Sequence, residues 1–233
     1  MKYATRIGLL AALAVLVTGR AEAQINQPPP AGNVVLDLNG TPIPTTYQQY
    51  TTAVFAATGA STNISFALRD DPAFLYLDDV TVRNVTTGAA VTVVNGGFES
   101  GPVGSSTPTG WTYLNQFGAA ASGIVSSGSA HTGNNEYFDG AVQAYDAITQ
   151  AIATTAGNLY TISFWLKESG SQATFSRVST NGNVTGTGGN GIDLLVYAGA
   201  IPTLATVPEP ASMAMLGTAL AALGVAARKR KHA

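Results

Sequence analysis

In the stretch Tyr160–Lys167, which reads YTISFWLK, apolar side chains occupy every second position. This period of two predicts a β-strand with one buried face and one exposed face. Residues 63–69 and 192–197 repeat the pattern, and stretches rich in Gly, Ser, Thr and Asn, such as 100–110 and 179–191, separate such runs. Outside the two ends of the chain, no window has the period of a long helix. The sequence therefore predicts an all-β fold, a β-sandwich or jelly roll.

The N-terminal end has the pattern of a secretory signal peptide. Lys2 and Arg6 precede an apolar run over 7–17, and Ala21-Glu22-Ala23 provides a cleavage site of the small-x-small type. We therefore expect a signal helix over 1–23 that signal peptidase removes, so that the mature chain begins near Gln24. Residues 24–32, which include three consecutive prolines, predict an extended leader.

The C-terminal end predicts a membrane anchor. Residues 211–227 are uncharged and mostly apolar, and the basic run Arg228–Lys231 follows them directly. Apolar residues partition into the bilayer while the bases stay in the cytoplasm, so we expect a linker over 202–212, a transmembrane helix over 213–227 and a basic cytoplasmic tail over 228–233. Since the apolar run is short and rich in Ala and Gly, it favours a temporary anchor. The alternative is an ordinary tail anchor that is never cleaved.

The tripeptide Pro208-Glu209-Pro210, preceded by Val207, stands just before this apolar run. In its order and spacing the whole segment resembles the PEP-CTERM sorting signal of Gram-negative bacteria that produce exopolysaccharide. The resemblance implies recognition by an exosortase, cleavage near the tripeptide, and transient anchoring in the inner membrane. Delivery to the cell envelope, outer surface or extracellular matrix would follow.

The charge of the exported part excludes one class of partner. Residues 24–206 contain four bases and eleven acids, a net charge of −7. Such a surface repels phosphate backbones, so nucleic-acid binding is excluded, whereas neutral sugars or divalent cations are suitable ligands. The alternative is that the charge only keeps an exported protein soluble. Because the chain has no cysteine, the domain must fold without disulfides.

A second resemblance covers most of the mature chain. Residues 95–101 (NGGFESG), followed by Trp111, resemble the opening strand of galactose-binding-like jelly rolls, the fold of many carbohydrate-binding modules. Residues 150–166 resemble the middle strands of that fold, and residues 47–55, 63–68 and 74–82 resemble its closing strands. Here the closing half, 33–85, precedes the opening half, 94–201. We therefore expect one circularly permuted sandwich over 33–201, joined by a hairpin over 80–94, with two incomplete halves as the alternative.

Catalysis is not expected. Between the two end segments the chain has one histidine, His131, and no cysteine, so no catalytic triad can be assembled. The carboxylate pairs Asp70-Asp71 and Asp78-Asp79 are adjacent in sequence, and adjacent side chains of a strand point to opposite faces. The sequence thus favours a protein that is not an enzyme.

The acids have another predicted use. Along residues 74–82 the even positions read Phe, Tyr, Asp, Val, Val, which places Asp78 on the more apolar face, where an unpaired carboxylate is costly. The jelly-roll resemblance implies a structural calcium ion held by Glu99 with Asp78 or Asp79, and by a carbonyl near Asn95. The alternatives are that Asp78 caps a turn or pairs with an arginine, and that Glu99 is only exposed.

Aromatic side chains are the candidates for sugar recognition. Trp165 should lie on the polar face of its strand, which is an unusual place for a tryptophan. Other aromatic residues lie in or beside loops: Trp111, Tyr113, Tyr137, Phe138 and Tyr145. The alternative is that these rings only cover the sheets or lie in the core, above all Trp111. We expect an exported surface or matrix protein that binds or organises extracellular polysaccharide, or else a structural or adhesive protein without a glycan site.

Overall fold

The computed structural model describes residues 29–70, 73–115, 123–142, 144–170, 177–178, 184–185 and 192–202. Wherever it describes the chain, the regular secondary structure is β, and no helix there is long and apolar enough to cross a membrane. The predicted signal helix, the sorting tripeptide, the transmembrane helix over 213–227 and the basic tail lie outside the described residues, as does most of the leader.

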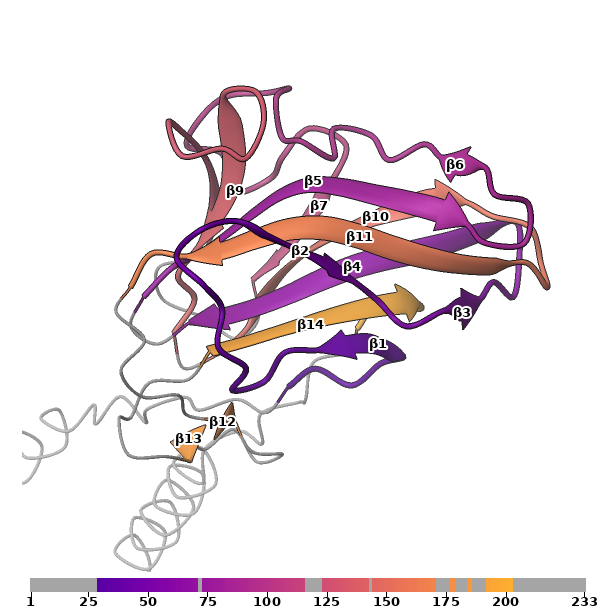
Figure 1. The fold of residues 1–233 in the computed structure, drawn as a ribbon, viewed down its shortest axis with the longest axis horizontal. Coiled ribbons are helices and arrows are strands. Elements are labelled where there is room, and N and C mark those ends of the chain that lie inside the picture. The colour runs from indigo at the N-terminus through magenta and orange to yellow at the C-terminus, as the bar shows by residue number, and fades with distance from the viewer. Residues whose placement is uncertain are drawn as a thin grey trace, which may run out of the picture. The chain divides into compact units, whose positions relative to one another are not determined.

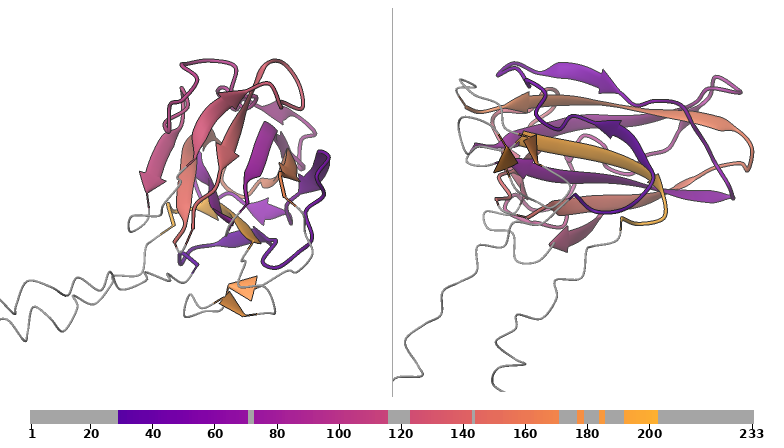
Figure 2. Two further views of the ribbon diagram at one scale, coloured as in Figure 1. Left: turned by 90° about the vertical axis from the view of Figure 1, so that its left-hand side faces the viewer. Right: turned by 90° about the horizontal axis from the view of Figure 1, so that it is seen from below.

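Two antiparallel sheets make up the fold (Figure 1). The five-stranded sheet has the order β1 (Val34–Asp37), β14 (Ile192–Gly199), β4 (Ser61–Asp70), β10 (Asp146–Ala153) and β7 (Thr112–Asn115). The seven-stranded sheet has the order β2 (Gln48–Thr51), β11 (Leu159–Glu168), β5 (Leu75–Asn84), β9 (Asn135–Asp139) and β8 (Ile124–Ser127); β3 (Phe55–Ala56) also pairs with β11, and β6 (Ala90–Val91) with β5. A short ribbon pairs β12 (Arg177–Val178) with β13 (Val184–Thr185). Figure 2 shows the sheets from two further sides.

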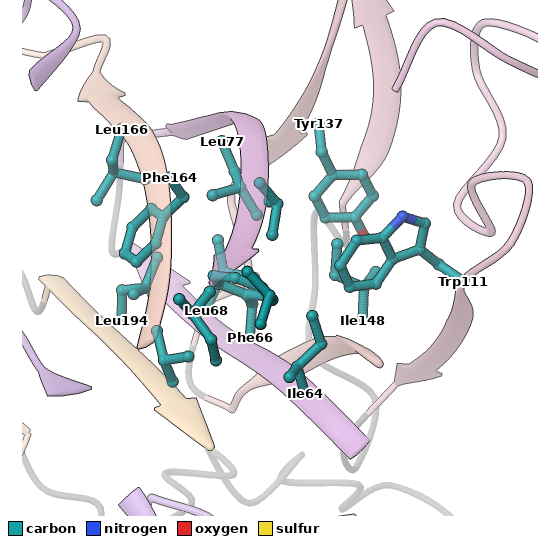
Figure 3. Packing of buried hydrophobic residues seen from close by; sticks show 14 of the residues in the cluster. Ile64, Phe66, Leu68, Leu77, Trp111, Tyr137, Ile148, Phe164, Leu166 and Leu194 are labelled. Carbon is teal, nitrogen blue, oxygen red and sulfur yellow. The ribbon is translucent and has the colours of Figure 1, made fainter. Parts of the chain in front are cut away.

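The core lies between the two sheets, as expected for a β-sandwich. On β11 the residues Tyr160, Ile162, Phe164 and Leu166 are buried and alternate with partly exposed ones, which confirms the period-two prediction for this strand. The ring of Phe164 meets that of Phe66 on β4 edge to face, with centroids 5.2 Å apart. Figure 3 shows side chains from β4, β10 and β14 pointing toward those from β5, β9 and β11.

Strands from both predicted halves enter each sheet. In the five-stranded sheet, β4 of the first half lies between β14 and β10 of the second. In the seven-stranded sheet, β5 of the first half lies between β11 and β9. The predicted hairpin between the halves is present, because β5 pairs with β6 across a turn at residues 85–87. The two halves therefore make a single sandwich, not two separate ones.

An irregularity in β5 corrects one expectation. Ser163 pairs with Thr81 but Trp165 pairs with Asp78, so β5 has one residue more than β11 over this interval. The extra residue is a β-bulge, and Asp79 within it has φ of 49°. Before the bulge the inward-facing residues of β5 are at odd positions, up to Leu77. From Asp78 onward they are at even positions, so Leu77 and Asp78 are both buried. Phe74 and Tyr76 therefore do not share the face of Asp78, because the strict alternation predicted over 74–82 breaks here.

A second turn lies beside the bulge. The residues Asn95–Phe98 form a tight turn in which Asn95 and Phe98 both have positive φ. The Asn95 side chain holds it together: its Oδ1 accepts from Ser100 N, and its Nδ2 donates to the carbonyls of Ser100 and Thr109. Its main-chain oxygen accepts from Trp111 Nε1. This turn places Glu99 close to the bulge of β5.

Candidate functional site

Partly exposed aromatic rings gather on the outer face of the seven-stranded sheet. Tyr76 on β5 pairs across the strands with Phe138 on β9 and with Lys167 on β11. The ring of Phe138 lies 5.3 Å from that of Tyr76 and stacks on Phe74 at 4.5 Å. We call this group of side chains the outer aromatic surface, and its members are Tyr47, Phe74, Tyr76, His131, Phe138 and Trp165.

Trp165 lies on the outer side of β11, as its strand pattern predicts, and a histidine covers one face of it. The imidazole of His131 stacks on the indole with 3.8 Å between centroids and an interplanar angle of 14°. Tyr47 meets the same imidazole edge on at 5.4 Å. His131 Nδ1 lies 2.7 Å from Asp79 Oδ2, so the carboxylate fixes the ring over the tryptophan.

A cation completes this surface. The ammonium group of Lys167 lies 4.6 Å from the ring centre of Tyr47 and 4.7 Å from that of Tyr76. It also donates a hydrogen bond to Ser129 O at 2.8 Å. Cation–π contacts of this kind hold both rings in place. The side chains of the outer aromatic surface are therefore tied to one another and to the loop that carries His131.

Three carboxylates hold that loop, residues 128–135, against the bulge. Asp78 Oδ2 accepts hydrogen bonds from the main-chain nitrogens of His131 and Thr132, at 2.8 and 3.2 Å. Asp79 Oδ1 accepts from the Thr132 hydroxyl. Glu99 Oε1 accepts from the nitrogens of residues 134 and 135, both at 2.8 Å. Burial raises the pKa of Asp78 to about 6, although the N–H donors oppose this rise.

The structure thus gathers the predicted calcium ligands Asp78, Asp79 and Glu99 around one loop, with Asn95 in the adjoining turn. The oxygens that would face a cation already accept hydrogen bonds from that loop. This agrees with the alternative for Asp78, a carboxylate that caps a turn. Among the residues that the structure describes, no group of three or more His, Cys, Asp or Glu side chains is arranged to hold a metal ion. A calcium ion at these residues stays a prediction.

The predicted aromatic candidates are divided between the surface and the interior. Trp111, Tyr137 and Tyr145 are at most 4% exposed. A ring inside the core offers no face to a sugar, so burial corrects the expectation for Tyr137 and Tyr145 and agrees with the alternative of a core position for Trp111. Tyr113, on β7 of the other sheet, is partly exposed and donates a hydrogen bond to Asp146. Of the six candidates, Trp165 and Phe138 are part of the outer aromatic surface.

Sequence reasoning missed several members of this surface. It gave His131 no binding role, because nothing in the sequence indicates that a loop over thirty positions away folds onto Trp165. It assigned Phe74 and Tyr76 to the inner face because the bulge was not foreseen. Tyr47 and Lys167 carried no signal of their own, although Lys167 was expected on the same face as Trp165 and lies there.

A shallow groove of about 290 Å³ lies farther along the same strands. Its lining residues come from β5, β11 and the β5–β6 hairpin: Thr81, Val82, Arg83, Gly88, Ala90 and Ser163. Ser163 is two positions before Trp165, so both side chains point to the same side of β11. The outer face therefore combines aromatic rings with a polar depression.

Comparison with known proteins finds a match at the C-terminal end of the chain. The model of the PEP-CTERM protein-sorting motif matches residues 206–231. No curated protein and no solved structure matches the chain. The motif indicates an exosortase-sorted protein that is exported to the surface of the cell envelope, and its described part is a β-sandwich. The predicted sorting residues Val207, Pro208, Glu209 and Pro210 fall inside the match.

Proposed function

We propose that this protein is a non-catalytic component of the cell surface or extracellular matrix that binds or organises extracellular polysaccharide through its outer aromatic surface. Signal peptidase would remove residues 1–23, and an exosortase would release the C-terminal anchor from the inner membrane. The sorting motif supports this route. The stacked, partly exposed Trp165 is the observation that carries the binding proposal.

The chemistry of the outer face suits a neutral sugar polymer. Pyranose rings present flat C–H faces that pack on aromatic rings, while their hydroxyls need polar partners at the edges. The rings of Trp165 and Tyr76 would pack against the C–H faces of the sugar. The hydroxyls of Thr81 and Ser163 in the groove would be the polar partners of its hydroxyl groups. A net charge of −7 on the exported part disfavours strongly acidic polymers.

The carboxylates near this surface support a non-catalytic role. Hydrolysis of a glycosidic bond needs two carboxyl groups on opposite sides of the bond, one of them free to donate a proton. Asp78 and Glu99 instead accept main-chain hydrogen bonds from the 128–135 loop. Asp79 is engaged by His131 and Thr132. A jelly roll of the galactose-binding-like type, in permuted order, is the fold type that we propose for the sandwich.

One observation favours the second candidate, a structural or adhesive protein without a glycan site. His131 already covers one face of Trp165, so that only the other face and the ring edge are open to a ligand. In that case the stack would only hold the 128–135 loop against the sheet. A binding assay with a control variant separates the two functions.

The test uses affinity electrophoresis of the full chain in gels that contain the exopolysaccharide of the source bacterium, a neutral glucan or alginate. Replacing Trp165 by alanine should weaken retention by the neutral polymers about fivefold or more, because a stacked ring contributes about 1–3 kcal/mol. Val34→Ala is the control, since Val34 is 40% exposed and lies on β1 of the other sheet. Equal retention of both variants and the wild type would favour the structural function.

Sorting is tested separately. Mass spectrometry of the protein recovered from the cell surface should give an N-terminus near Gln24 and a C-terminus near Pro208–Pro210. Replacement of Glu209 by alanine should leave the protein in the inner membrane with its tail intact. Surface protein that retains residues 211–233 would contradict processing by an exosortase.

A further inference from the structure

Two buried carboxylates face each other where the chain passes from one sheet to the other. Asp139 ends β9 in the seven-stranded sheet, and Asp146 begins β10 in the five-stranded sheet. Both are fully buried. Tyr137 lies two positions before Asp139 and therefore points to the same side of β9, into the core. Burial raises the pKa of Asp139 well above its ordinary value, and the nearby carboxyl group of Asp146 adds to that rise.

Two of the four carboxylate oxygens of Asp139 and Asp146 accept hydrogen bonds. Asp139 Oδ1 accepts from Ala141 N at 2.9 Å, while Asp146 Oδ2 accepts from Gly123 N at 2.7 Å and from the Tyr113 hydroxyl at 3.1 Å. The other oxygens, Asp139 Oδ2, Asp146 Oδ1 and Tyr137 Oη, are buried without a hydrogen-bond donor or acceptor among the described residues.

Two of these free oxygens lie close together. A methyl group on Gly123 would collide with both Tyr137 Oη and Asp139 Oδ2, so the two atoms converge on the α-carbon of this glycine. The amide of Gly123 donates to Asp146 on the same side. A residue without a side chain is thus required where Tyr137 Oη and Asp139 Oδ2 meet, because a methyl group would collide with both.

Facing carboxylates in an apolar interior need a positive charge or a proton between them. The charges that act most strongly on Asp139 come from the carboxylates of Asp146 and Asp70, and both are negative. A proton shared by Asp139 and Asp146 would relieve the repulsion between the two carboxylates. It would leave the phenol oxygen of Tyr137 without a partner. A hard cation accepts several oxygen ligands at once, including carboxylate, carbonyl and water oxygens.

We propose that Asp139 and Asp146 bind a calcium ion that links the two sheets at this end of the sandwich, with Tyr137 Oη and the main chain at Gly123 beside it. This site is separate from the one predicted at Asp78 and Glu99, and it does not depend on the polysaccharide function. The exported domain meets calcium at the millimolar concentrations at which extracellular calcium modules bind it.

The experiment measures thermal unfolding of the full chain after treatment with chelator, with and without 5 mM calcium at pH 7. For a dissociation constant of about 0.1 mM, calcium should raise the melting temperature by roughly 5 °C. Asp139→Asn and Asp146→Asn should abolish this rise, while Glu99→Gln, a carboxylate outside the pair, should keep it. Magnesium at the same concentration should have a smaller effect.

A second measurement covers the case in which the Asn variants fail to fold. Terbium luminescence excited through tyrosine should appear in the wild type, fall on addition of calcium, and be strongly reduced in Tyr137→Phe. A wild-type melting temperature unaffected by calcium would overturn the proposal, as would a calcium-induced rise that persists in both Asp139→Asn and Asp146→Asn. An effect lost in Glu99→Gln but kept in Asp139→Asn would place the ion at the 128–135 loop instead.

Discussion

Replacing Asp193 by asparagine should change how the stability of the sandwich depends on pH. Asp193 is fully buried on β14 and accepts a short hydrogen bond from the Tyr145 hydroxyl. Burial raises its pKa from 3.8 to about 7; the Tyr145 hydrogen bond and Arg69 oppose that rise, and the carboxylate of Asp37 adds to it. The folded protein therefore keeps this proton at a pH where the unfolded chain has released it.

The sign and size of the pH effect on stability follow from this difference in the pKa of Asp193 between the folded and unfolded states. Below about pH 4 both states are protonated and Asp193 contributes no pH dependence. Between about pH 4 and 7 the unfolded chain loses the proton first, so the free energy of unfolding falls with rising pH and then levels off above about pH 7. Three pKa units correspond to about 4 kcal/mol, an upper bound. Asparagine stays neutral and its Oδ1 can still accept from Tyr145, so it removes this loss.

Urea denaturation at intervals between pH 4 and 8 is the measurement. The stability of Asp193→Asn relative to the wild type should rise by a few kcal/mol from the acid to the alkaline end. Other carboxyls titrate in both proteins and cancel in the comparison. Asp37→Asn, an exposed neighbour on β1, is the matched control and should retain most of the wild-type slope. If the curves for Asp193→Asn and the wild type run parallel, Asp193 is ionised in the folded state and the reasoning is wrong.

Two further predictions concern stability. Gln150→Ala should lower the free energy of unfolding by about 2–4 kcal/mol in urea melts, because Gln150 is the partner of Val94 N, Val94 O and Gly110 O. An unchanged midpoint would mean that water replaces these bonds at no cost. Phe164→Ala should cost about 3–5 kcal/mol by calorimetry, whereas Val54→Ala at an exposed position should stay within about 0.5 kcal/mol. Similar losses of stability in Phe164→Ala and Val54→Ala would contradict the placement of Phe164 in the core.

The strands were predictable because their hydrophobic period is local. Residues 160–167 alternate without interruption, and so do the burial classes of β11. The burial of Asp78 could also be predicted from its apolar neighbours, and it is fully buried. Its partners could not be predicted, since they are main-chain nitrogens of His131 and Thr132, more than fifty positions away. No pattern in the sequence reports which loop folds back to supply donors.

The bulge in β5 connects the two features that the sequence left unrelated, a buried carboxylate and an exposed aromatic surface. Without the extra residue, Tyr76 would point inward with Val80 and Val82, and the outer face would lose the ring that lies between Phe138 and Lys167. Asp78 keeps the inward phase of Val80 and Val82, so it stays in the core, where it binds the loop that carries His131 onto Trp165. The bulge therefore brings Tyr76 to the outer face while Asp78 stays buried, so a variant that restores regular pairing in β5 should remove Tyr76 from the outer aromatic surface and leave Asp78 in the core.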